Sequence, residues 1–233
     1  MAENVTNDEP DYLGHRERLR RRFLLGGGRD MPDYELLELL LTIAIPRRDV
    51  KPLAKELIRK FGSFAGVVNA PLEELMLVKG VKENKAAVLR IVRECSVRSS
   101  WQSLKGMDAP VISDFDAMVD YCRSAMAYQT VEEFRIIFLN SKLYVIGEEI
   151  QQRGTVDQVA IHPREVIKSA MMHGASAMIL VHNHPSGIVT PSKADMEITK
   201  RIKEAAEAVS IRLFDHLIIS KSSVYSFHNQ GFV

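Results

Sequence analysis

The sequence has few cysteines, no long apolar run and almost no net charge. Its only cysteines, Cys95 and Cys122, are too few for a disulfide framework, so a reducing cytoplasm is the simplest setting. No apolar stretch approaches the length of a membrane span, and the polar, acidic first residues are unlike a secretory signal. A net charge of +1 excludes a molecule that is polycationic as a whole.

The hydrophobic content and its patterning indicate a folded protein of two domains. Hydrophobic residues make up 46% of the 233 residues, which is enough for a real core. Helical patterns fill residues 14–98, a turn-rich stretch at 99–108 is the expected linker, and residues 109–233 alternate strands with helices. We therefore expect a small all-α domain followed by a mixed α/β domain.

The helical region has two features that are compatible with contacts to DNA phosphates. Arginines surround a few apolar residues in the segment 14–25, which is also typical of a solvated amphipathic helix. Residues 75–89 resemble a helix-hairpin-helix, in which loop N–H groups can hold a phosphate. Gly80 and Val81 fit that loop, but Lys82 stands where a second glycine is usual. A helical packing module explains this segment equally well, so both interpretations stay open.

Turn and capping signals predict the elements around these segments. Asp33 is expected to cap the second helix, and Asp114 a helix that runs through Met126. Residues 134–140 and 143–151 predict a β-hairpin, and residues 213–220 a further strand. The helix that follows Ser192 is expected to carry one apolar face, formed by Ile198, Ile202, Ala205 and Val209.

Two histidines at the end of an apolar run are the most informative feature of the sequence. Residues 177–181 are typical of a buried strand, and His182 and His184 follow it two positions apart. Side chains at i and i+2 of an extended chain point the same way, so both imidazoles can reach one point. Asp195 follows where a helical pattern begins. Two imidazoles, a carboxylate and an open position are the ligand set of a catalytic zinc site.

Each part of this pattern also has a structural interpretation. Ser192 and Asp195 form a Ser-x-x-Asp pattern before an apolar-periodic helix, which predicts a capping box. Both interpretations can hold together, because a cap fixes the helix start that directs Asp195 towards a metal. Asn183 should point to the opposite face of the strand and hydrogen-bond the scaffold.

A hydrolytic zinc site also needs a general base. The candidates are Glu132, Glu133, Glu148, Glu149 and Glu165. Glu132 and Glu133 stand just before the strand predicted from Phe134, where a carboxylate can face a site at the end of a sheet. The others are more typical of surface strand charges or, for Glu165, of the first turn of a helix.

Together these motifs resemble a known family. His182-x-His184-Pro185 followed by Ser192-x-x-Asp195 resembles the JAMM (MPN+) metal motif, and the flanking segments 162–165 and 215–219 are similar to RadC proteins. The resemblance implies a JAMM/MPN sandwich, a mixed β-sheet flanked by helices, over residues 109–233. It implies zinc bound by His182, His184 and Asp195, with Ser192 stabilising an oxyanion. The JAMM glutamate most closely matches Glu132, and next Glu133.

The function that this resemblance implies is zinc-dependent hydrolysis of a peptide or isopeptide bond in a peptide or protein substrate. The rival is a DNA-associated protein linked to repair or recombination, in which the helical domain contacts DNA without sequence preference and the metal is structural or vestigial.

Overall fold

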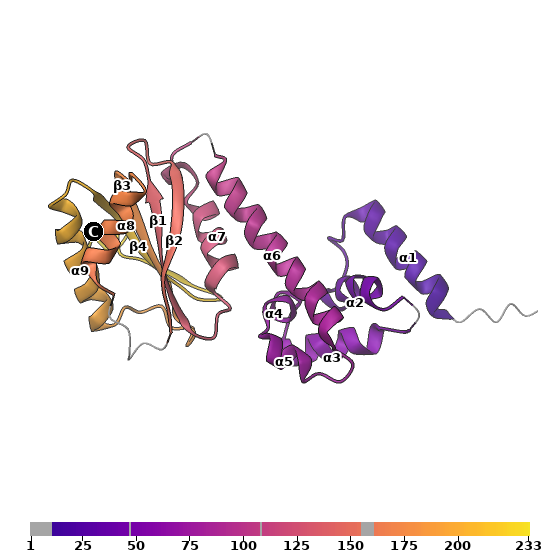
Figure 1. The fold of residues 1–233 in the computed structure, drawn as a ribbon. Coiled ribbons are helices and arrows are strands. Elements are labelled where there is room, and N and C mark those ends of the chain that lie inside the picture. Colours follow the sequence, from indigo (N-terminus) through magenta and orange to yellow (C-terminus); the bar gives the residue numbers. More distant parts are fainter. Residues whose placement is uncertain (1–10, 47, 108, 155–160) are drawn as a thin grey trace, which may run out of the picture. The chain divides into compact units, whose positions relative to one another are not determined.

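The computed structural model describes residues 11–46, 48–107, 109–154 and 161–233, and the chain divides between Glu94 and Cys95 into two compact units (Figure 1). Within the described residues, the first unit contains helices but no strand, whereas the second combines helices with one mixed β-sheet. Among the described helices, none is both long enough and apolar enough to cross a membrane.

The helical unit is built from short helices around a leucine-rich core. Its elements are α1 (Asp11–Gly26), α2 (Asp33–Ala44), α3 (Lys51–Phe61), α4 (Phe64–Asn69), α5 (Leu72–Met76) and the first part of α6 (Glu83–Lys105). Leu37, Leu57 and Leu89 are fully buried in its core. Gly62 ends α3 with φ +86°, a backbone conformation that glycine adopts at low cost.

Two details of this unit differ from the expectation or refine it. Asp33 does not cap α2: Pro32 holds the cap position, and the Asp33 carboxylate accepts the N–H of Phe64 at 2.7 Å. In the loop between α5 and α6, Gly80 has φ +95°, which requires glycine, whereas Lys82 is not among the residues with positive φ. The loop therefore needs only one of the two glycines that are usual in a helix-hairpin-helix.

Helix α6 continues through residues 99–105, so the turn-rich stretch expected from Ser99 is wrong there. Val97, Trp101 and Leu104 pack against the core of the second unit, and the Trp101 and Tyr121 ring centroids are 5.0 Å apart. Burial of these side chains favours the helix over the weak helical propensity of the neighbouring serines. Residue 108, the end of the expected linker, lies outside the described residues.

The second unit has a five-stranded sheet in the order β2-β1-β3-β4-β5. Only the β3–β4 pair is parallel. The strands are β1 (Glu132–Leu139), β2 (Val145–Gly154), β3 (Ala177–Asn183), β4 (Arg212–Ile219) and β5 (Val224–Ser226), and the helices that follow α6 are η1 (Val111–Asp114), α7 (Phe115–Met126), α8 (Pro163–Met172) and α9 (Lys193–Glu207). The expected hairpin is the antiparallel β1–β2 pair, and Asp114 caps α7 by accepting the N–H of Ala117, both as expected.

Helices cover both faces of this sheet (Figure 1). Helix α7 packs on one face against Ile137, Ile179 and other alternate strand residues, and α8 and α9 pack on the opposite face against Ile136 and Leu180. A mixed sheet between helices confirms the predicted fold class. The apolar face of α9 is shorter than expected, because the helix ends at Glu207 and Val209 beyond it is 41% exposed.

Candidate metal centre

The two histidines lie at the end of strand β3, His182 within the strand and His184 just after it, on the sheet face that α9 covers. His182 pairs with Phe134 of β1 and shares the face of Leu180, which belongs to the core under α8 and α9. His184 follows the last strand residue, but its N–H donates to the Ile219 carbonyl of β4 and keeps the chain extended. The two imidazole Nε2 atoms are consequently 3.0 Å apart. The sequence expectation that both rings reach one point agrees with this geometry.

Asp195 reaches the same point from the first turn of α9. The Ser192 hydroxyl accepts the N–H of Asp195, and the Asp195 carboxylate accepts the N–H of Ser192, so the expected capping box is present. One carboxylate oxygen lies 3.3 Å from Nε2 of His182, and the other lies 3.7 Å from Nε2 of His184. We call His182, His184 and Asp195 the His-His-Asp cluster; one ligand atom from each lies within 4.8 Å of the others.

Each imidazole makes a hydrogen-bond contact through its Nδ1 atom, which leaves its Nε2 atom available to bind a cation. Nδ1 of His184 lies 2.6 Å from the Ile188 carbonyl, which can only accept, so Nδ1 carries the proton. Nδ1 of His182 lies 2.8 Å from Nε2 of His216. Two imidazole nitrogens and a carboxylate oxygen are ligands that Zn²⁺ prefers, and three protein ligands leave an open position. The donor set of the cluster therefore fits zinc.

The charges of the cluster favour an anionic aspartate. Burial alone would raise the pKa of Asp195, but the neighbouring His184 and His182 imidazoles and the hydrogen bonds with Ser192 hold that pKa below its usual value. The neighbouring Asp195 carboxylate raises the pKa of His184, whereas burial lowers the pKa of His182 to about 4. A carboxylate beside a neutral, buried imidazole is the charge distribution that a cation would neutralise.

Glu132 lies beside the cluster, at the start of β1. Phe134 pairs with His182, and continuing this antiparallel register by two residues puts Glu132 opposite His184. Burial raises the pKa of Glu132, the charge of His184 lowers it in part, and the Asp195 carboxylate raises it further. Glu132 thus shares the electrostatic environment of the cluster without being one of its ligands.

Glu133 belongs to a different environment. Both glutamates are strand residues rather than residues that precede the strand, and successive side chains of a strand point to opposite faces. Glu133 is 1% exposed, and its carboxylate forms ion pairs with Arg135 and Arg153. Arg135 also bonds Tyr121 at 2.8 Å and Glu148 at 2.9 Å. Glu133 and Glu148 are therefore parts of one ion-pair network.

The remaining carboxylates have partners away from the cluster. Glu149 accepts hydrogen bonds from Gln151 and Ser169, and Glu165 pairs with Arg164 and Lys168 on the surface of α8.

Asn183, between the two histidines, connects β3 to the backbone around Glu132. Its side-chain oxygen accepts the N–H of Glu133 at 2.8 Å, and its side-chain nitrogen donates to the Val131 carbonyl at 3.1 Å. The expected hydrogen bonding to the scaffold is present, and it holds the chain on both sides of Glu132.

Sequence reasoning missed two residues behind the cluster, His216 of β4 and Thr199 of α9. His216 contacts His182, and Thr199 contacts both His216 and the Asp195 carbonyl. Helical spacing from Asp195 to Thr199 would have suggested the second residue. No local pattern relates His216 to β3, because their contact depends on the parallel pairing of β3 with β4.

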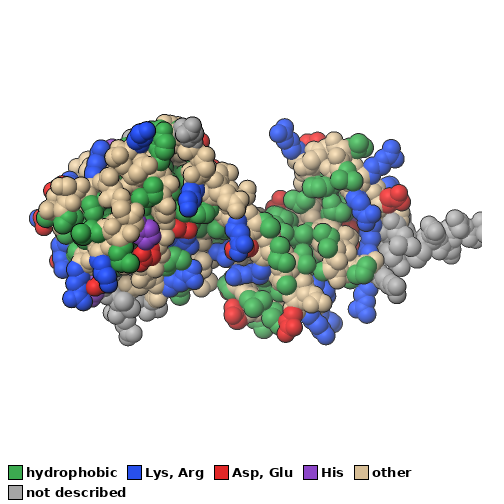
Figure 2. Space-filling model, turned by 45° about the horizontal axis from the view of Figure 1, so that its top comes forward, with side chains coloured by type: hydrophobic (Ala, Val, Ile, Leu, Met, Phe, Trp, Pro, Cys, Tyr) green, Lys and Arg blue, Asp and Glu red, His purple; other side chains and the backbone are tan. Residues whose placement is uncertain are grey.

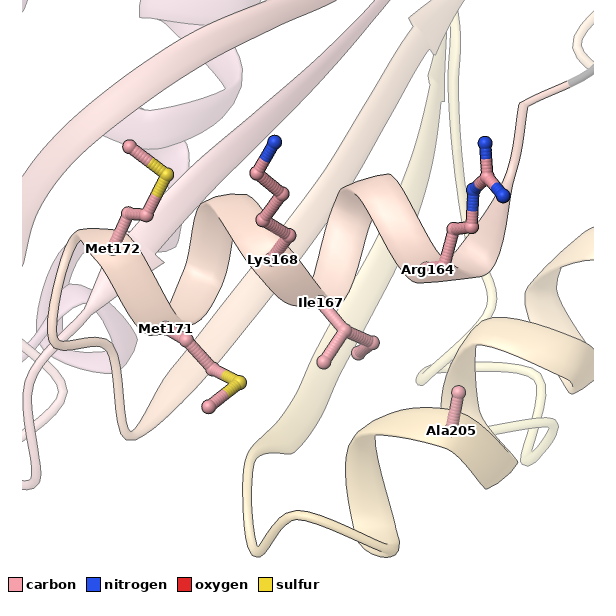
Figure 3. A pocket seen from close by; sticks show the side chains of 6 residues that line it. All are labelled: Arg164, Ile167, Lys168, Met171, Met172 and Ala205. Atoms are coloured by element: carbon pink, nitrogen blue, oxygen red, sulfur yellow. The ribbon is translucent and has the colours of Figure 1, made fainter.

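An apolar pocket of this unit lies elsewhere, between α8 and α9 (Figure 3). Its lining consists of side chains from α8 and one residue of α9: Arg164, Ile167, Lys168, Met171, Met172 and Ala205. No member of the His-His-Asp cluster lines it, so the pocket adds nothing to the chemistry of the cluster.

Comparison with known proteins agrees with this architecture. Residues 112–232 match the family model described as a RadC-like JAB domain, and residues 12–87 match the UPF0758 N-terminal model. A UPF0758 protein of Ruegeria pomeroyi is 49% identical over 225 residues, which cover 96% of this chain and 100% of the relative. A UPF0758 protein of Rhodobacter capsulatus is 50% identical over 213 residues, covering 91% of this chain and 99% of the relative. The chain therefore belongs to the RadC-like JAB domain family, within the JAMM/MPN class, and carries the UPF0758 N-terminal domain.

Proposed function

We propose that this protein is a zinc-dependent hydrolase that cleaves a peptide or isopeptide bond in a peptide or protein substrate. The observation that supports it is the convergence of the His182 and His184 Nε2 atoms and the Asp195 carboxylate, with Glu132 beside them. Membership of the JAMM/MPN class adds support for the metal motif. The free cysteines Cys95 and Cys122 suit a reducing cytoplasm.

The His-His-Asp cluster would hold the zinc through Nε2 of His182, Nε2 of His184 and the Asp195 carboxylate. Zinc at such a site polarises a carbonyl and lowers the pKa of a coordinated water towards ~7. Glu132 supplies the proton transfer: burial raises the pKa of its carboxyl, which brings the group closer to the range in which it can both accept and release a proton. It takes a proton from the attacking water and delivers it to the leaving amine.

Ser192 supplies a hydrogen-bond donor for the oxygen that becomes negatively charged during attack. Its hydroxyl oxygen accepts the N–H of Asp195, so the capping box does not use the hydroxyl proton. Ser192 is an exposed residue, so its hydroxyl proton can be directed towards a bound substrate. Donors of this kind stabilise a tetrahedral oxyanion most where the site excludes water.

The test combines metal analysis with one pair of variants. Purified protein should contain or take up about one zinc per chain, and linear and isopeptide-linked peptides should be screened for cleavage. Glu132→Gln should keep zinc and lower any cleavage rate by about 10²–10⁴-fold, because general acid–base catalysis contributes that much. Glu165→Gln is the matched control, since Glu165 is a carboxylate with its own partners on α8.

Two results would contradict the proposal. Protein that refuses added zinc would remove the metal from the mechanism. If Glu132→Gln left the cleavage rate unchanged and Glu165→Gln abolished it, the general base would be Glu165 on α8 rather than Glu132.

The second candidate function is a DNA-associated protein in which the helical unit contacts phosphates. The glycine conformation of Gly80 and the N-terminus of α6 just after it favour this, because exposed N–H groups of a helix start attract anions. Lys and Arg side chains lie at several places on the visible face of the helical unit, among apolar side chains and a few acidic ones (Figure 2). Contacts of this kind would be insensitive to sequence.

A further inference from the structure

A buried row of hydrogen bonds connects two members of the His-His-Asp cluster from behind. Nδ1 of His182 lies 2.8 Å from Nε2 of His216, and Nδ1 of His216 lies 2.6 Å from the Thr199 hydroxyl. The Thr199 hydroxyl in turn donates to the backbone carbonyl of Asp195. The row thus starts at one ligand of the cluster, passes through β4 and α9, and ends at the backbone of another.

The row lies in a dry part of the unit. His216 is fully buried and Thr199 is 3% exposed. The Phe227 ring stacks on His216 with centroids 4.8 Å apart, and the Phe134 ring meets its edge at 5.8 Å. Water cannot replace a missing hydrogen bond there, so each polar atom needs its protein partner.

Counting protons allows one arrangement that satisfies all three contacts. The Asp195 carbonyl can only accept, so the Thr199 hydroxyl uses its single proton on it. The hydroxyl oxygen must then accept from Nδ1–H of His216. A neutral His216 with its proton on Nδ1 has a lone pair on Nε2, which accepts from Nδ1–H of His182. His182 is left with its lone pair on Nε2, the atom that faces His184 and Asp195.

The opposite arrangement costs a hydrogen bond. If Nε2 of His216 donated to His182, its Nδ1 would need the Thr199 proton. Two oxygens, the Thr199 hydroxyl and the Asp195 carbonyl, would then face each other without a proton between them. The first arrangement therefore dominates, because it keeps every hydrogen bond of the row and leaves the Nε2 lone pair of His182 beside His184 and Asp195, where a cation would be held.

We propose that His216 and Thr199 are positioning residues that fix the tautomer and the ring orientation of His182, so that its Nε2 lone pair is ready for a metal ion. This inference rests on the proposed function only for the identity of the metal. Residues that orient a metal-binding histidine in this way typically change metal affinity by about 10–100-fold when they are replaced.

Thr199 provides the sharpest variants, because its hydroxyl can be removed without a change of shape. Thr199→Val loses the acceptor for His216, whereas Thr199→Ser keeps it and serves as the rescue. We expect zinc affinity, measured by chelator competition at a fixed neutral pH, to fall about 10–100-fold in Thr199→Val and to stay near the wild-type value in Thr199→Ser. Thermal melting of the zinc-free variants checks that both are folded.

His216→Leu removes the acceptor for His182 directly and should show the same loss of zinc affinity. Should this variant fail to fold, the Thr199 pair still decides the question. Equal zinc affinities for Thr199→Val, Thr199→Ser and the wild type would overturn the proposal.

A second readout separates this inference from the proposed function. Long-range ¹H–¹⁵N NMR spectra of zinc-free wild-type protein report which ring nitrogen carries the proton. His182 and His216 should both be protonated on Nδ1, and Thr199→Val should change the tautomer of His216. If the wild type does not bind zinc, the proposed function fails, and the inference about His216 and Thr199 is then judged by the tautomers alone. A proton on Nε2 of His182 would overturn that inference.

Discussion

The side chain of Asn183 replaces the backbone pairing between β1 and β3 at the point where their ladder ends. The last ladder pair is Phe134 with His182. Beyond it, Asn183 accepts the N–H of Glu133 and donates to the carbonyl of Val131. We expect Asn183→Ala to release the chain around Glu132 and to destabilise the second unit.

The expected loss follows from the two hydrogen bonds. The Glu133 N–H is buried, and leaving a buried donor without an acceptor costs about 1–3 kcal/mol. The Val131 carbonyl is only partly buried and can regain water, so its loss adds about 0.5–1.5 kcal/mol. Asn183→Ala should therefore lower the free energy of unfolding by about 1.5–4.5 kcal/mol.

Urea unfolding of the zinc-free protein measures this difference. Trp101 is the single tryptophan and packs on Tyr121, so its fluorescence follows the second unit alone. Asn140→Ala is the matched control, because the Asn140 side chain also makes two hydrogen bonds to the backbone, in this case by accepting the N–H groups of Lys142 and Tyr144 at the opposite end of β1. The control should lose about 1 kcal/mol or less. Equal losses in the two variants would refute the role we assign to Asn183.

Three further changes have defined outcomes. His184→Ala should abolish zinc binding but leave the unfolding of zinc-free protein within about 1 kcal/mol of the wild type, since the cores of the second unit do not involve His184; global unfolding would indicate a structural metal. Glu133→Gln should lower the free energy of unfolding by about 3 kcal/mol, because it leaves the buried Arg135 with one carboxylate partner fewer; a neutral effect in urea unfolding would contradict the network. If the helical unit binds DNA, the affinity should fall steeply with salt and ignore base sequence, as titrations on unrelated duplexes would show; strong sequence preference would contradict phosphate contacts.

Local sequence patterns predicted the site correctly where residue spacing alone determines the direction of a side chain or the start of a helix. Two histidines at i, i+2 must share a face of an extended chain, and the Ser192–Asp195 capping pattern fixes where α9 begins. The convergence of the three side chains additionally requires that α9 pack beside β3. The packing of α9 beside β3 could be predicted from the resemblance of the whole sequence to RadC proteins, but not from the individual residues.

Tertiary packing decided the features that the sequence patterns misplaced. Residues 99–105 contain serines and resemble a linker, but Trp101 and Leu104 of the same segment are held by the core of the second unit and keep it helical. Asp33 is a residue type that often caps helices, yet its carboxylate accepts the N–H of Phe64 at the start of α4 rather than an N–H of its own helix. Neither partner is near in sequence, so no local pattern could reveal it.

The proposal that Glu132 rather than Glu133 is the general base depends on the register of β1 against β3, in which an error of one residue would exchange the two glutamates. Side chains alternate along β1, so a shift by one position would exchange the residue that faces the cluster with the residue that is buried among arginines. Two independent contacts fix the register, the pairing of Phe134 with His182 and the Asn183 bond to the Glu133 N–H. Because Glu133 stabilises the fold, loss of activity in Glu133→Gln would not identify a base. Glu132→Gln with unchanged zinc affinity and unchanged unfolding, compared with Glu165→Gln, isolates proton transfer from both metal binding and stability.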